Sequence, residues 1–146
     1  MPEEEIETPE EEKPEETEKS YIKVLSPKGG EIWELGKTYT ISWEHSGVDE
    51  IYISIVDYNA SEQCLLNNEK PISAKTGKYT FKLDTCIAHP GMSQYIEVPI
   101  SPGDKYKVLV YSEDKPDTIR DFSDNYFSII FLRRNYRWFL QKNKEF

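Results

Sequence analysis

The chain is 146 residues long and carries 27 acidic and 18 basic side chains, for a formal net charge of -9. This length has room for one ordinary domain with tails, so two large domains are excluded. The sequence pI near 4.8 argues against a nucleic-acid partner, because binding to phosphates needs a basic surface. No apolar stretch approaches the roughly 20 residues that cross a bilayer, so we predict no transmembrane segment. The first residues do not resemble a signal peptide, so we expect either a cytosolic protein or an export signal that lies outside these residues.

Residues 1–20 hold ten Glu and two Lys and repeat a Pro-Glu-Glu unit three times, beginning at Pro2, Pro9 and Pro14. Apart from the initial methionine, Ile6 is the only sizeable apolar side chain in this segment. Such a sequence has almost nothing to bury, its like charges repel one another, and its prolines stiffen the chain. We therefore predict that residues 1–20 form a disordered acidic spacer.

From residue 21 onward, apolar and polar side chains alternate in short β-rich runs that are separated by Pro, Gly, Asn and Asp. Seven strands are predicted, at residues 21–26, 38–44, 51–57, 71–74, 78–84, 105–112 and 126–131. Their alternation turns Trp43 inward, between the sheets, and also turns Phe131 inward. The segment 85–104 contains three prolines and two glycines and is predicted to be a crossover loop. With no amphipathic helix between the strands, the pattern predicts an all-β fold, an immunoglobulin-like antiparallel β-sandwich over residues 21–131, with a barrel as the alternative.

The two cysteines, Cys64 and Cys86, are compatible with one disulfide or with two free thiols, and they are too few for a metal cluster. One follows the third predicted strand and the other follows the fifth, in segments that we expect to be loops. A crosslink between these loops would staple the domain, so we predict a disulfide.

Several segments together have a recognisable pattern, namely VLSPKGGEIW at 24–33, TYTISW at 38–43, GKYTF at 77–81, YKV at 106–108 and SDNYFSI at 123–129. They resemble the β-sandwich family typified by the N-terminal domain of KNH-type yeast cell-wall synthesis proteins, which is also described as Ser/Thr-rich and GPI-anchored. The resemblance covers roughly residues 21–130. It implies a role in glucan assembly in fungi, and a repeated extracellular module in prokaryotic surface proteins. It therefore implies an extracellular or cell-surface location, and it brings no catalytic residues or cofactor with it.

The sequence offers little support for an enzyme. There is no Gly-x-Ser-x-Gly motif, and no carboxylate spacing indicates the paired acids of a glycosidase, which remains the enzymatic alternative. Acidic side chains do crowd the approach to the last predicted strand, where a calcium site is the alternative to a solvated acidic loop. We predict the acidic loop and no metal, for the residues Glu113, Asp114, Asp117, Asp121 and Asp124.

A candidate binding face follows from the strand alternation. In an immunoglobulin-like order the third, sixth and seventh predicted strands share a sheet, and the parity that buries Ile53, Val108 and Ile129 turns other side chains outward. Aromatic side chains on such a face are suited to contact sugar rings or a partner's side chains. The predicted ligand or partner face consists of Tyr52, Val56, Leu109, Tyr111, Tyr126 and Ile130.

Residues 132–146 form a basic, aromatic tail, in which Arg and Lys interleave with Leu, Tyr, Trp and Phe. The apolar spacing suits one face of a short helix, and we predict that this segment docks on its own domain or is an extension past the closing strand. Basic and aromatic residues together also suit a membrane surface or nucleic acid, which are the alternatives. Instead of a ligand, this tail is the other candidate to cover the predicted face.

The resulting prediction is a non-catalytic, extracellular β-sandwich module of a cell-surface or cell-wall-associated protein. Its partners would be cell-wall polysaccharide or neighbouring surface-protein domains, and the alternative is a structural spacer without a ligand.

Overall fold

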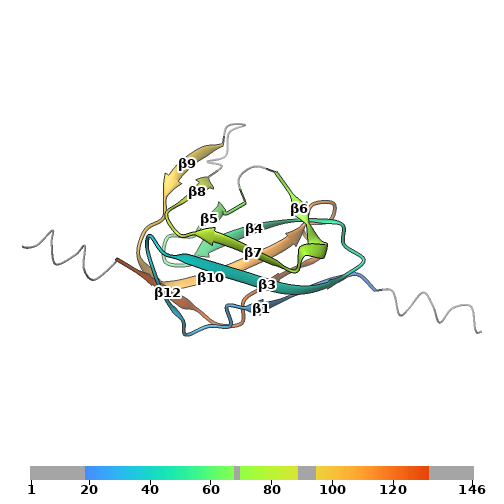
Figure 1. The fold of residues 1–146 in the computed structure, drawn as a ribbon, viewed down its shortest axis with the longest axis horizontal. Helices are drawn as coiled ribbons and strands as arrows, with labels where there is room; N and C mark the ends of the chain where they lie inside the picture. The colour runs from blue at the N-terminus through green and yellow to red at the C-terminus, as the bar shows by residue number, and fades with distance from the viewer. Residues whose placement is uncertain (1–18, 68–69, 89–94, 132–146) are drawn as a thin grey trace, which may run out of the picture.

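The structure is a computed structural model that describes residues 19–67, 70–88 and 95–131 (Figure 1). These residues form an all-β fold, as predicted, and none of their helices is long and apolar enough to cross a membrane. The elements are β1 (Tyr21–Ser26), β2 (Ile32–Glu34), β3 (Thr38–Ser46), β4 (Glu50–Asp57), β5 (Glu62–Leu65), β6 (Ile72–Ser73), the 3-10 helix η2 (Ala74–Thr76), β7 (Lys78–Lys82), β8 (Thr85–Ala88), β9 (Ile96–Pro99), β10 (Gly103–Ser112), β11 (Arg120–Phe122) and β12 (Phe127–Ile130).

The strands form two sheets of unequal size. The small sheet has the order β1-β3-β7, and the large sheet has the order β2-β12-β10-β4-β5-β8-β9, with β11 paired to β10 and β6 paired to β4. The strand ladders are antiparallel except for β2, which runs parallel to β12. In Figure 1 the small sheet lies in front of β4 and β10, whereas β8 and β9 extend past its β7 edge. The third, sixth and seventh predicted strands are neighbours, as predicted, and a complete immunoglobulin-like order stays a prediction.

The predicted strand parity is confirmed in the long strands. Trp43 is only 3% exposed, and Ile53, Val108 and Ile129 are also buried. The indole Nε1 of Trp43 donates a hydrogen bond to the carbonyl oxygen of Ala74 at 3.1 Å, so the polar atom of this large side chain is satisfied inside the core. One core therefore joins both sheets, with side chains from β1, β3 and β7 packed against those from β4, β10 and β12.

An aromatic cluster anchors one part of this core to β2, a strand that the sequence pattern did not predict. The Trp33 ring stacks on Tyr39 at 4.6 Å between centroids and contacts Phe127 at 4.5 Å. The Trp33 ring also meets Phe81 edge-on at 5.9 Å. Since Tyr39 and Phe81 belong to the small sheet and Phe127 to the large one, Trp33 holds the two sheets together.

The acidic segment before β12 is partly structural rather than simply solvated. Asp121 lies on β11, and its carboxylate accepts a hydrogen bond from the Val24 backbone N–H of β1 at 2.8 Å. The buried hydroxyl oxygen of Ser123 accepts from the Val108 backbone N–H at 3.0 Å. Asp121 thus links an edge of the large sheet to the small sheet, a role that an acidic-loop interpretation misses.

Three predicted boundaries are wrong. The segment 85–104 is not a single crossover loop, because β8 and β9 lie within it as an antiparallel pair. Pro99 contributed to the prediction of a loop, but it is the last residue of β9. This strand is at the edge of the sheet, where a missing N–H is tolerated. The predicted strand 71–74 shortens to two residues followed by η2, whose N-cap is Ser73. Phe131, which was expected to face inward, is exposed beyond the end of β12.

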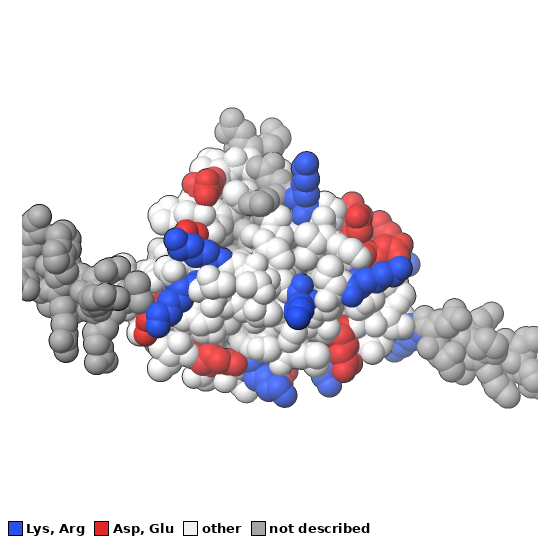
Figure 2. Space-filling model, in the orientation of Figure 1, with Lys and Arg blue, Asp and Glu red and all other residues white. Residues whose placement is uncertain are grey.

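Charged side chains are unevenly placed on the face seen in Figure 2. Lys, Arg, Asp and Glu lie mainly around its periphery, and uncharged surface covers much of the middle, over β3 and β7. Thr40 and Thr80 are register partners there, and their hydroxyl oxygens lie 2.8 Å apart in a hydrogen bond. The predicted spacer and tail fall almost wholly outside the described residues, at 1–18 and 132–146.

Candidate functional site

The predicted ligand or partner face lies on the large sheet, on the side that faces away from the core. Tyr126 and Ile130 are exposed, and Tyr52, Val56 and Tyr111 are half-buried. The prediction is wrong in detail at Leu109, which is only 3% exposed. Leu109 pairs with Ser54 of β4 on one side and with Phe122 of β11 on the other, so neighbouring strands flank it closely.

Tyr52 and Tyr111 are register partners on β4 and β10, and their rings stack with centroids 5.6 Å apart. Burial raises the pKa of both hydroxyls, and the neighbouring Glu113 carboxylate raises the pKa of Tyr52 further. The two rings therefore already pack against each other and against neighbouring groups, and only part of their surface is open to a ligand.

A second tyrosine pair is more open. Tyr58 and Tyr126 are each 41% exposed, and their rings meet edge-on at 5.4 Å between centroids. The Lys107 ammonium lies over both rings, 5.2 Å from the Tyr126 centroid and 5.9 Å from that of Tyr58. Beside them, the Asn59 amide donates to the Asp104 carboxylate at 2.8 Å. We call Tyr58, Tyr126 and Lys107 the tyrosine platform.

Sequence reasoning missed Tyr58, although a signal for it was present. Tyr58 directly follows the predicted strand 51–57, and it continues the outward parity of Tyr52 and Val56. The backbone N–H of Tyr58 donates to the Lys105 carbonyl oxygen at 2.9 Å, so the pairing of β4 with β10 extends to this residue. Extending the predicted strand by one residue would have placed the ring on the predicted face.

A cleft of about 520 Å³ opens on the other side of the large sheet. Five neighbouring strands, β10, β4, β5, β8 and β9, contribute to its walls. The apolar part of the lining includes Ile55, Cys64, Cys86, Val98, Ile100 and Tyr106. Its volume falls in the range of small-ligand pockets.

The predicted disulfide is confirmed, and it forms part of the wall of this cleft. Cys64 and Cys86 are bonded, with their Cα atoms 5.6 Å apart. They lie on β5 and β8, not in the loops that we expected. The bond crosslinks two four-residue strands that share a single register pair, Leu65 with Ile87.

Tyr106 stands between the core and the cleft. Its hydroxyl donates to the Ser101 carbonyl oxygen at 2.6 Å. Burial, together with the neighbouring Asp57 and Glu62 carboxylates, raises the pKa of Tyr106 to about 12. Both carboxylates also line the cleft, so its polar part has a negative potential.

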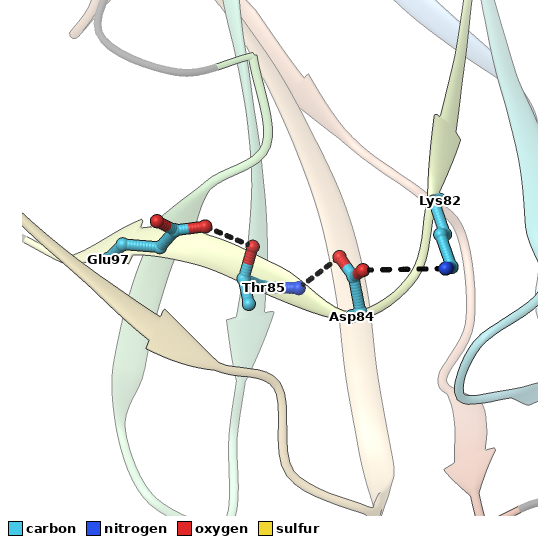
Figure 3. Close-up of polar contacts among 4 residues, drawn as sticks. All are labelled: Lys82, Asp84, Thr85 and Glu97. Atoms are coloured by element: carbon cyan, nitrogen blue, oxygen red, sulfur yellow. Dashed lines mark hydrogen bonds and ion pairs between the residues drawn. The ribbon is translucent and has the colours of Figure 1, made fainter.

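A polar corner fixes the place where the chain leaves the small sheet and enters the large one (Figure 3). The Asp84 carboxylate accepts from the Thr85 backbone N–H at 2.6 Å and lies 4.0 Å from the Lys82 ammonium. The Thr85 hydroxyl donates to Glu97 of β9 at 2.7 Å, and the Ile100 backbone N–H donates to the Asp84 carbonyl oxygen at 2.9 Å. The corner therefore holds the β8–β9 pair in place beside β7.

Within the part of the chain that the structure describes, no group of three or more His, Cys, Asp or Glu side chains is placed to hold a metal ion. Comparison with known proteins found no family model, no curated protein and no solved structure that matches this chain.

Proposed function

We propose that this chain is a non-catalytic β-sandwich module that binds polysaccharide through its tyrosine platform, in an extracellular or cell-surface protein. The observation that carries the proposal is the open pair of Tyr58 and Tyr126. Exposed aromatic rings present flat apolar surface to the C–H faces of sugars, and nearby amide, carboxylate and ammonium groups provide partners for sugar hydroxyls. Asn59, Asp104 and Lys107 are such groups.

The proposed location is supported by the disulfide between Cys64 and Cys86. Disulfides form and persist mainly in oxidising compartments, such as the extracellular space and the cell surface. The resemblance to KNH-type cell-wall synthesis proteins supports the same setting, and membership of that family is part of this proposal. A neighbouring surface-protein domain is a further partner that this setting provides.

A structural spacer without a ligand is the second candidate. The observation that favours it is the stacked pair of Tyr52 and Tyr111, because these half-buried rings already contact each other. The near-complete burial of Leu109 adds to this, since it reduces the apolar surface open to a partner. In a spacer, the outer face would serve only to stabilise the domain.

Retention on insoluble glycans separates the two candidates. We expect the intact chain to be retained on at least one of β-glucan, cellulose or chitin particles. Tyr58→Ala with Tyr126→Ala should weaken retention at least about tenfold, since stacking on an aromatic side chain contributes on the order of 1 kcal/mol per ring. The matched control is Tyr21→Ala, which removes an equally exposed tyrosine from β1 on the other sheet.

Two results would contradict the proposal. The first is a platform double variant that retains its native circular dichroism and still binds as tightly as the intact chain. The second is an intact chain that passes through all three glycans unretained, a result that supports the spacer instead.

A further inference from the structure

The cleft is not used by the proposed function, and its position in the fold is unusual for a sandwich. In Figure 1, β8 and β9 extend past β7, the last strand of the small sheet, so among the described residues no strand of that sheet faces their inner side there. As a result apolar groups remain accessible. Val98 is half-buried on the cleft wall, and Ile96, two residues earlier and therefore on the same side of β9, is exposed.

The cleft is bordered by a sheet edge. β9 is the terminal strand of the large sheet: it pairs with β8 on one side, and within the described ranges no strand pairs with its other side. Backbone groups along such an edge can pair with an added extended segment, here through the C=O groups and the N–H groups other than at Pro99, which has none. Alternate side chains of that segment would then point to the inner side of the sheet, where Val98 and the disulfide lie.

Charge indicates what kind of side chain would fit. Asp57 and Glu62 line the cleft, and none of the described residues that line it is Lys or Arg. A Lys or Arg side chain matches this lining, because its aliphatic stem can contact Ile55 and Val98 while its charged end reaches the carboxylates.

The site is also held firmly before any partner arrives. The disulfide joins β5 to β8, and the polar corner of Asp84, Thr85 and Glu97 joins β8 to β9 and to the end of β7 (Figure 3). Strands fixed in this way lose little further conformational entropy when a segment binds, which favours affinity.

We propose that an extended, basic peptide segment of a partner protein adds to the free edge of β9 and places alternate Lys or Arg side chains in the cleft. The cleft and the edge thus form one protein-docking site. It lies on the opposite side of the large sheet from the tyrosine platform, so the two sites are independent.

The test uses the full chain and three synthetic eight-residue peptides with capped ends. The first alternates lysine with valine, the second alternates glutamate with valine, and the third is the lysine peptide with N-methyl groups on alternate backbone nitrogens. We expect the lysine peptide to bind at least about tenfold more tightly than the glutamate peptide by calorimetry, because only its charge is complementary to the cleft. N-methylation should abolish binding, because it blocks the pairing with a strand edge.

Variants assign the binding to the cleft. Asp57→Asn with Glu62→Gln should weaken binding of the lysine peptide at least about tenfold, as expected when the charged partners of a basic side chain are removed. Asparagine at 57 retains an oxygen to accept from the Asn59 backbone N–H, so the local turn is kept. The matched control is Glu113→Gln with Asp114→Asn, which changes the net charge equally at a separate acidic groove.

Equal binding of the lysine and glutamate peptides would overturn the proposal, as would equal losses in the two double variants. Undiminished binding of the N-methylated peptide would overturn the strand addition. A lysine peptide that fails to bind at millimolar concentration would overturn the site as a whole. None of these results affects glycan retention, so the failure of this proposal and the failure of the proposed function are distinguishable.

Discussion

The closed part of the sandwich and its cleft end are both built from β-strands but are stabilised differently. In the closed part, long strands from both sheets bury side chains such as Ile41, Val108 and Phe127 almost completely. At the cleft end, β5, β8 and β9 have four residues each, and the apolar side chains Ile96 and Val98 remain partly open. Burial alone therefore stabilises the cleft end less.

This difference shows how a small domain can keep an open site without losing its fold. Where the described strands of the small sheet do not cover the large sheet, a covalent bond and a set of short hydrogen bonds supplement the lower burial. Low local burial is also what a binding region needs, because a fully packed surface has nothing left to offer a partner. The predictions below test whether the two regions are stabilised in these separate ways.

The largest expected effect is in the closed part. Trp43→Ala should lower the free energy of unfolding by about 3–5 kcal/mol, because it leaves a cavity in a packed core and removes the partner of the Ala74 carbonyl oxygen. Urea unfolding followed by circular dichroism measures this loss. Tyr21→Ala, at an exposed aromatic position of similar strand context, should lose far less. A loss of less than about 1 kcal/mol for Trp43→Ala would show that the sheets do not close around this side chain.

A somewhat smaller effect is expected at the cleft end. Cys64→Ala with Cys86→Ala should lower the free energy of unfolding by about 3 kcal/mol, since the bond closes a sequence separation of 22 residues. Hydrogen exchange should show that β8 and β9 lose protection first, while β3 and β10 retain theirs. Mass spectrometry of unreduced protein after alkylation provides the control for the bond itself. A uniform loss of protection across both regions would contradict the separation that we infer.

The closed part was largely predictable from the sequence because its strands are long enough to show the pattern. Ile51, Ile53 and Ile55 occupy alternate, buried positions of β4, and Tyr106, Val108 and Val110 do so in β10, although the intervening Ser54 and Leu109 are buried as well. Three or more alternations fix the inner face of a strand and, with it, the register of the core. Trp43 was placed correctly for the same reason.

The cleft end could not be predicted in this way. β5 begins with Glu62 and Gln63, and β9 ends in Pro99, so both segments resemble loops by composition. Their pairing depends on the disulfide and on contacts with residues distant in the sequence, such as the hydrogen bond of Thr85 to Glu97. The disulfide itself was predictable from the two cysteines, whereas the cleft that it lines was not. The tyrosine platform was half predicted, through Tyr126, because strand alternation was stopped one residue short of Tyr58.

The smallest expected effect lies where the two regions meet, at Tyr106. Its pKa is raised from the ordinary value of 10.0 to about 12, mainly by burial, so the folded state favours the neutral hydroxyl. Below pH 10 this residue is neutral in both the folded and the unfolded states, and its contribution to stability is fully present. As the pH rises from 10 towards 12, the unfolded state releases the proton first, so stability falls.

Tyr106→Phe should therefore make the free energy of unfolding less dependent on pH in this alkaline window. At neutral pH the same variant should be about 1 kcal/mol less stable, because the Ser101 carbonyl oxygen loses its donor. Tyr52, Tyr79 and Tyr111 also have raised pKa values, so the comparison must be the difference between the two proteins in urea unfolding at matched pH. Parallel curves for the two proteins between pH 10 and 12 would mean that solvent from the cleft reaches the Tyr106 hydroxyl, and that the core ends before this residue.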